Sequence, residues 1–393
     1  MAKINTKKVP LLAQVIAAII LGILLGGVCP VWLTRVFATF NGLFSNFLGF
    51  IIPVLILGLI APGIADLGKT AGKMLLITVI LAYGFTLFSG FFTYLVAGLS
   101  FDYLLAGADF FGRGAAQAAA NAKAYFSVAM PPLMDVMTAL ILGFLIGLGT
   151  AVTGGKNIKT FMEELRSIIY AVINKVIIPL IPLYIFGIFL DMTAAGQVAS
   201  ILAVFLKIII LIFFITIVML LIQFSIAGAA ARKNPFKMLK NMLPAYFTAL
   251  GTQSSAATIP VTLEQTLTNG VRRDVADFVV PLCATIHLSG STMKIVACSL
   301  AIMFVSGMPV HFGAYSGFIF MLGITMVAAP GVPGGAIMAA VGILQSMLGF
   351  DEQAIGLMIA LYIAMDSFGT ACNVTGDGAI AVIINKIYKG AHT

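Results

Sequence analysis

The segment from 361 to 387 carries two carboxylates, an amide and a hydroxyl in a stretch that is otherwise mostly apolar or small. Asp366, Thr370, Asn373 and Asp377 follow one another at spacings of four, three and four residues. In one α-helix these spacings place the four side chains on one face, within about 60° of one another. Because no basic residue accompanies them on that face, we expect the carboxylates to bind cations, such as an ammonium group and a metal ion.

A second polar motif favours the opposite charge. The sequence GTQSSAATIP places Ser254 and Ser255 where a predicted half-helix begins. Hydroxyls and free backbone N–H groups at a helix start favour a carboxylate. An ammonium site and a carboxylate site together describe an amino acid. The simpler interpretations are an ordinary serine cap here and, in the segment 361–387, buried polar groups that tie helices together.

The composition places both motifs in a membrane. The chain has 393 residues, of which 61% are hydrophobic and 9% charged, whereas a soluble domain carries about 25% charged residues. This composition excludes a soluble protein, and with it a nucleic-acid-binding role for the net charge of +8. Residues 10–29 predict a first transmembrane helix without the cleavage pattern of a signal peptide. The four cysteines form no CxxC motif and are expected to be buried thiols.

The apolar segments and the basic loops between them predict the topology. The segments run over 10–29, 37–63, 73–98, 128–152, 167–191, 197–230, 241–260, 275–306, 312–349 and 353–387. Lys and Arg concentrate on alternate loops, so both termini are predicted to face the cytoplasm. The segments around GTQSSAATIP and APGVPGG each enter and leave on one side. The sequence therefore predicts an all-α membrane protein of the cell inner (plasma) membrane, with eight transmembrane helices and two opposed re-entrant helical hairpins.

Three motifs together resemble one family. GTQSSAATIPVT, GVPGG and DSFGTACNVTGD are similar to the first hairpin, the second hairpin and the last helix of the dicarboxylate/amino acid:cation symporter family. The resemblance implies a homotrimer in the lipid bilayer, in which a scaffold domain holds each protomer while a transport domain moves. The implied division is scaffold helices 1 and 2 (1–72), transport-domain helix 3 (73–98), scaffold helices 4 and 5 (99–196), transport-domain helix 6 (197–232), the first hairpin (238–270), helix 7 (271–306), the second hairpin (312–350), and helix 8 with the C-terminal tail (351–393).

The resemblance also implies roles for single residues. The position of Asp366 takes the substrate amine, those of Asn373 and Ser255 hold the α-carboxylate, and that of Asp377 binds sodium with help from Asn373. The candidate substrate-binding residues are Ser254, Ser255, Asp366, Gly369, Thr370 and Asn373. The candidate sodium-binding residues are Asp377, Asn373, Thr285 and Cys283.

Two departures from the family pattern predict a neutral substrate. Members that carry acidic substrates have an arginine three residues after the amine-binding aspartate, where this chain has Gly369. Some members have it just before the serines, where this chain has Gln253. No basic residue then remains to pair with a second carboxylate. We therefore expect a small neutral amino acid, with a hydroxyl side chain as one option.

The seventh helix departs further, because the family motif NMDGT reads HLSGS over 287–291. The missing aspartate predicts fewer than the family's usual three sodium sites. His287 is either a hydrogen-bonded helix histidine or a titrating group near Asp377 that replaces a sodium by a proton. Lys294 is either a lysine that snorkels from a helix end or a fixed ammonium in a vacated cation site. The two residues are seven apart, so on one continuous helix they share a face.

The sequence thus predicts a secondary active symporter that takes up a neutral amino acid with sodium by an elevator-type mechanism, with protons as a further coupling ion to be tested. The alternative within transport is a proton-coupled carrier of an amino acid or a dicarboxylate that uses no sodium. An ion channel with an acid-lined pore is the alternative from another class. An enzyme is not expected, because no metal-ligand cluster and no convincing nucleophile motif is present.

Overall fold

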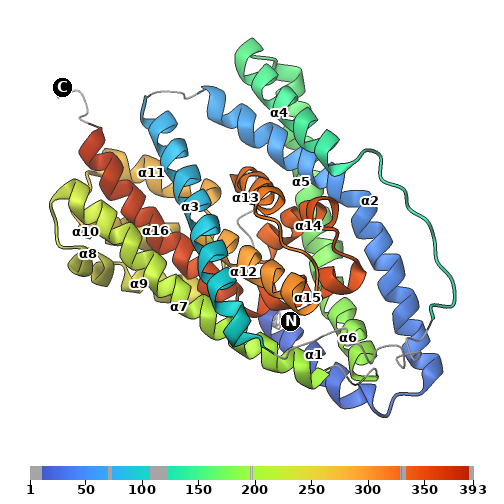
Figure 1. The fold of residues 1–393 in the computed structure, drawn as a ribbon. Helices are drawn as coiled ribbons and strands as arrows, with labels where there is room; N and C mark the ends of the chain where they lie inside the picture. Colours follow the sequence, from blue (N-terminus) through green and yellow to red (C-terminus); the bar gives the residue numbers. More distant parts are fainter. Residues whose placement is uncertain are drawn as a thin grey trace, which may run out of the picture.

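The computed structural model describes residues 11–69, 73–106, 123–194, 196, 198–327, 329 and 333–388, and the regular elements in these ranges are helices (Figure 1). In chain order they are α1 (Leu11–Gly26), α2 (Val31–Lys69), α3 (Lys73–Leu104), α4 (Val136–Thr153), α5 (Lys156–Val172), a π-helical stretch (Ile173–Ile177), α6 (Ile178–Ala194), α7 (Val198–Ala231), α8 (Pro235–Asn241), α9 (Leu243–Thr252), α10 (Ser255–Thr268), α11 (Arg273–Ile286), α12 (Ser289–Val305), α13 (Phe312–Val327), α14 (Gly335–Leu348), α15 (Glu352–Ala364) and α16 (Asp366–Ile387).

Long apolar helices dominate the described part of the chain. Six helical stretches are long and apolar enough to cross a bilayer: Val31–Gly63, Met74–Leu104, Lys156–Ala194, Ile201–Ala231, Arg273–Val305 and Asp366–Ile387. A span of the hydrocarbon core needs about 20 apolar residues, because a helix rises 1.5 Å per residue. The chain is therefore an all-helical integral membrane protein, as the composition indicates.

The helices pack in two groups with a third set between them (Figure 1). The first group consists of α1, α4, α5 and α6 with α2, and the second of α3, α7 and α9 to α12 with α16. Helices α13, α14 and α15 contact both groups: α13 packs on α3, α14 on α2, and α15 on α6 and α12. The division into scaffold and transport domains that the resemblance implies stays a prediction.

Three apolar segments predicted as continuous are interrupted in the structure. The segment 128–152 becomes helical only at Val136, because Pro131 and Pro132 disfavour a helix and Asp135 caps α4 by accepting the Thr138 N–H at 2.9 Å. The segment 275–306 is two helices, α11 and α12. The segment 353–387 is two helices, α15 and α16, separated at Met365.

Two helix–turn–helix pairs lie where the sequence predicts hairpins. Helices α9 and α10 pack on each other and on α16, and their turn contains Gln253 with a left-handed φ of 53°. Helices α13 and α14 pack on each other, and α14 begins after Gly334, whose φ is 73°. Residues 328 and 330–332 of the APGVPGG region lie outside the described residues.

Candidate functional site

The polar face of α16 is buried in the protein. Asp366, Asn373 and Asp377 expose 4%, 2% and 1% of their surface. Helix α16 runs without a break from Asp366 through Gly376 to Ile387. Buried ionic and amide groups in a membrane-spanning helix are costly unless they have partners. The structure supplies those partners from the interrupted helix pairs around α16.

Asp366 is paired with Lys294. The Lys294 Nζ donates to Asp366 Oδ1 at 2.8 Å, and the Gly334 backbone N–H donates to Asp366 Oδ2 at 2.9 Å. Lys294 is 0% exposed, so it does not snorkel to a surface. Both carboxylate oxygens are therefore engaged, and the start of α16 is tied to α12 and to the start of α14.

The surroundings of Lys294 fix its position. Its Nζ lies 3.7 Å from the centroid of the Tyr362 ring, a cation–π contact. Its Cε occupies the place where a Cβ on Gly369 would sit, and such a Cβ would lie 2.6 Å from Nζ. A Cβ on Gly290 would in turn overlap the Gly369 carbonyl oxygen. A Cβ at 369 would therefore force the end of the Lys294 side chain to shift, a constraint that sequence reasoning about a missing arginine did not find.

Asn373 caps the start of α12. Its Oδ1 accepts the Gly290 N–H at 2.7 Å and the Ser291 N–H at 3.4 Å, and its Nδ2 donates to Ser291 Oγ at 3.2 Å. The Tyr362 hydroxyl donates to the same Oγ at 3.0 Å. The first N–H groups of a helix lack partners within it, and this side chain supplies one from α16. The sequence did not predict Tyr362 or Ser291 as site residues, although Tyr362 lies just before Asp366 in the chain.

Asp377 contacts His287. The His287 Nδ1 and the Asp377 Oδ1 are 2.8 Å apart, and the two side chains are 0% and 1% exposed. A Cβ on Gly376 would lie 2.6 Å from Gln223 Oε1 and 2.6 Å from His287 Cε1. Gln223 Oε1 and His287 Nε2 are buried and have no hydrogen-bond partner among the described residues. Two unpartnered acceptor-capable atoms thus lie beside Gly376, the residue before Asp377, when the imidazole donates through Nδ1.

The break between α11 and α12 allows both His287 and Lys294 to reach α16. Asp366 and Asp377 are eleven residues apart, about 16 Å along a helix, whereas seven helical residues rise only about 10 Å. His287 is extended at φ −105° and ψ 98°, which lengthens the path from His287 to Lys294. The predicted continuous helix is therefore wrong here, and both side chains reach α16 because the helix is broken.

The remaining predicted residues occupy varied positions. Ser254 caps α10, its Oγ accepting the Ala257 N–H at 3.3 Å, and Ser255 begins α10 and is buried. Thr370 donates to the Asp366 carbonyl at 2.9 Å. Thr285 is exposed and donates to the Leu282 carbonyl, whereas Cys283 is buried in α11. Within the described ranges, no group of three or more His, Cys, Asp or Glu side chains could hold a metal ion.

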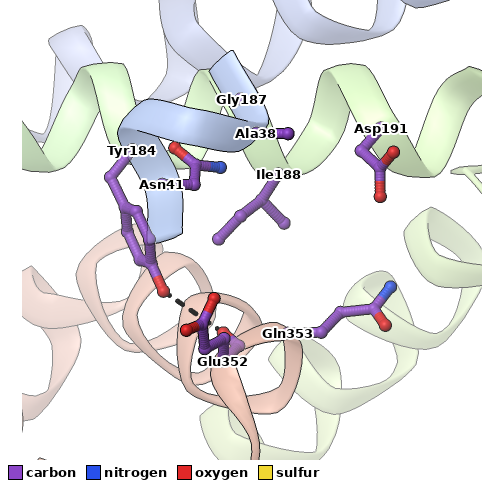
Figure 2. Close-up of a pocket in the computed structure, with 8 residues that line it drawn as sticks. All are labelled: Ala38, Asn41, Tyr184, Gly187, Ile188, Asp191, Glu352 and Gln353. Carbon is purple, nitrogen blue, oxygen red and sulfur yellow. Dashed lines mark hydrogen bonds between the residues drawn. The ribbon is translucent and has the colours of Figure 1, made fainter. Parts of the chain in front are cut away.

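A cavity of about 240 Å³ lies apart from these residues, between α2, α6 and α15 (Figure 2). The Tyr184 hydroxyl donates to the Glu352 carbonyl across it at 3.2 Å. Asn41, Asp191 and Gln353 also line it. The cavity therefore marks a partly polar boundary between the first helix group and α15, and it is separate from the polar face of α16.

Comparison with known proteins identifies the class. The profile of the sodium:dicarboxylate symporter family matches residues 11–387. The chain therefore belongs to this family, whose description implies sodium coupling. The family and the relatives below are transporters and not enzymes.

Three relatives illustrate the range of similarity. The chain is 27% identical over 400 residues to the serine/threonine transporter SstT of Acinetobacter baumannii (strain AYE), covering 94% of this chain and 95% of that one. It is 29% identical over 262 residues to excitatory amino acid transporter 1 of Rattus norvegicus, covering 65% of this chain and 47% of that one. It is 32% identical over 159 residues to excitatory amino acid transporter 5 of Mus musculus, covering 40% of this chain and 28% of that one. The match thus spans about half the length of the rat protein.

Proposed function

We propose that the protein is a secondary active symporter that moves a small carboxylate-bearing solute together with sodium. The supporting observation is the convergence of interrupted helices on one buried polar face. The starts of α12 and α14 donate backbone N–H groups to Asn373 and Asp366. Helix starts favour anions, and carboxylates and carbonyls favour cations; here α16 supplies the acceptors of both helix starts. Such broken helices at membrane depth are typical of transporter sites.

A neutral amino acid is the first candidate substrate. The Acinetobacter relative, a serine/threonine transporter, supports it, as does the presence of Gly369 and Gln253 at the two positions where an arginine would pair with an acidic substrate. In this proposal Ser254, Ser255 and Asn373 serve the substrate carboxylate. We further propose eight crossings with two re-entrant pairs, α9–α10 and α13–α14, cytoplasmic termini, a homotrimer and an elevator movement of the α16 group past the α2 group.

Sodium is proposed to bind near Asp377. Gln223 Oε1 is a buried oxygen without a partner among the described residues, and it lies beside the imidazole of His287, because both would contact a Cβ on Gly376. Oxygen atoms of this kind suit a hard cation. Because His287 already contacts Asp377, we propose fewer than three sodium ions per cycle, with a proton on His287 replacing one of them.

A carboxylate without an amine is the second candidate substrate. One specific observation favours it: the Lys294 ammonium already lies on the carboxylate that the family resemblance assigns to a substrate amine. The two candidates differ in a single functional group, which makes them separable by experiment.

Uptake into proteoliposomes tests the transport proposal. Purified protein is reconstituted, inward gradients of sodium and of protons are imposed separately, and the uptake of labelled amino acids and small carboxylic acids is measured. We expect at least one of these solutes to accumulate above its external concentration when sodium is supplied. Equilibration without accumulation under either gradient would favour a channel. Accumulation with the proton gradient alone would favour the proton-coupled carrier.

A further inference from the structure

We propose that Lys294 supplies the ammonium that Asp366 would otherwise take from a substrate, so that the site carries small 2-hydroxy- or 2-oxo-monocarboxylates in preference to amino acids. This inference rests on the transport function proposed above and names its substrate class. It makes Lys294 a specificity-determining residue.

Both carboxylate oxygens of Asp366 already have partners. One oxygen accepts from Lys294 Nζ at 2.8 Å and the other from the Gly334 N–H at 2.9 Å. The pair has no net charge, so it offers a second ammonium no net attraction. An incoming ammonium would also lie close to the Lys294 charge, and like charges in a poorly solvated site disfavour each other. An α-amino group is therefore rejected at this position.

Lys294 is held in place by its surroundings. It is 0% exposed, lies against the Tyr362 ring, and fills the space that glycine at 369 leaves open. Moving the ammonium away would leave one buried charge on the lysine and another on Asp366, which is unfavourable in an apolar interior. The lysine is therefore a built-in part of the site and not an occupant that a substrate displaces.

The occupied site fits a substrate that carries a hydroxyl or oxo group in place of the amine. A lysine ammonium has three N–H donors, of which Asp366 takes one. A substrate hydroxyl or oxo oxygen can accept from another, and a hydroxyl can also donate to the carboxylate. The substrate carboxylate is left to the hydroxyls of Ser254 and Ser255 at the start of α10. A second substrate carboxylate finds no unbalanced cation, because Asp366 already neutralises Lys294, so dicarboxylates are disfavoured.

A matched pair of substrates tests the inference directly. L-lactate and L-alanine share their carbon skeleton and differ only in a hydroxyl against an ammonium group. We measure sodium-driven uptake of labelled L-lactate, L-alanine and succinate by the wild-type protein in proteoliposomes, and thermal stabilisation of the purified protein by each solute. L-lactate is expected to bind at least about tenfold more tightly than the other two. Accumulation of L-alanine or succinate in preference to L-lactate would establish transport and overturn this inference. Accumulation of none of the three, with other solutes accumulated, would also overturn it.

Variants of the ion pair supply the second arm. Lys294→Met keeps a long side chain but frees the Asp366 carboxylate, so preference should move toward L-alanine by about tenfold or more. Lys294→Met combined with Asp366→Asn restores neutrality and should lose the gain for L-alanine, which also controls for a folding defect in the single variant. Lys207→Met on α7, outside the site, is the matched control and should leave the preference unchanged. An unchanged preference in folded Lys294→Met would contradict the proposal.

Discussion

His287 and Asp377 face each other in the buried interior, with Nδ1 and Oδ1 2.8 Å apart, although they lie 90 residues apart in the chain. The pair forms because α11 ends at Ile286 and leaves His287 extended beside α16. Phe85 packs edge-on against the imidazole, and the backbone carbonyl of the buried Cys283 accepts the His287 backbone N–H at 2.8 Å. Asp377 is thus the ionisable side chain in direct contact with this histidine.

Proton binding at His287 should weaken sodium binding. A protonated imidazole beside Asp377 cancels the charge that attracts sodium, and histidine is the side chain that ordinarily changes charge near neutral pH. We expect the sodium concentration for half-maximal transport to rise as the pH is lowered from about 8 to about 5.5. His287→Asn should remove this dependence. Equal pH dependence in wild type and variant would reduce His287 to a structural hydrogen-bonding residue.

Gly369→Ala should destabilise the protein through Lys294. The added Cβ would overlap Lys294 Cε and lie 2.6 Å from Nζ, and overpacking of this kind costs about 1–3 kcal/mol. Gly98→Ala in α3, where a Cβ meets nothing within 4 Å, is the matched control and should be neutral or stabilising by up to about 1 kcal/mol. Thermal unfolding in detergent measures both. Equal melting temperatures for the two variants would show that Lys294 does not require glycine at 369.

Asn373→Ala should loosen the start of α12. It removes the acceptor of the Gly290 N–H and the donor to Ser291 Oγ, and an unsatisfied buried N–H costs about 1–3 kcal/mol. Thr375→Val is the control on the same helix, because the Thr375 hydroxyl is buried without a partner among the described residues and its loss should cost little. If unfolding shows Asn373→Ala to be as stable as Thr375→Val, the proposed capping role is wrong.

A disulfide between α6 and α15 should stop the proposed elevator movement. A Cβ at Gly356 would lie 3.2 Å from Ile188 Cγ1, so cysteines at 188 and 356 fall within the span of a disulfide. Oxidised Ile188→Cys/Gly356→Cys should bind solute but not transport it, and reduction should restore uptake. Each single cysteine variant, treated with the same oxidant, is the control. Full transport by the cross-linked protein would exclude sliding at this boundary.

Much of the fold follows from the sequence, because apolar runs and basic loops mark the helices. The spacing of Asp366, Asn373 and Asp377 likewise predicts the buried face of α16. The partners of these residues were less predictable, since they depend on the break after Ile286. Sequence reasoning left two options for Lys294, because the acid that pairs with it lies on another helix and no periodic pattern joins the two.

A double-mutant cycle on Lys294 and Asp366 tests whether a resident ammonium neutralises Asp366. Thermal or denaturant unfolding is measured for wild type, Lys294→Met, Asp366→Asn and the double variant. Each single variant leaves one buried charge without its partner, a loss of about 3–5 kcal/mol. If Lys294 neutralises Asp366, the double variant is more stable than either single variant. Losses that add to within about 0.5 kcal/mol would show that the two residues are energetically independent and would contradict the account.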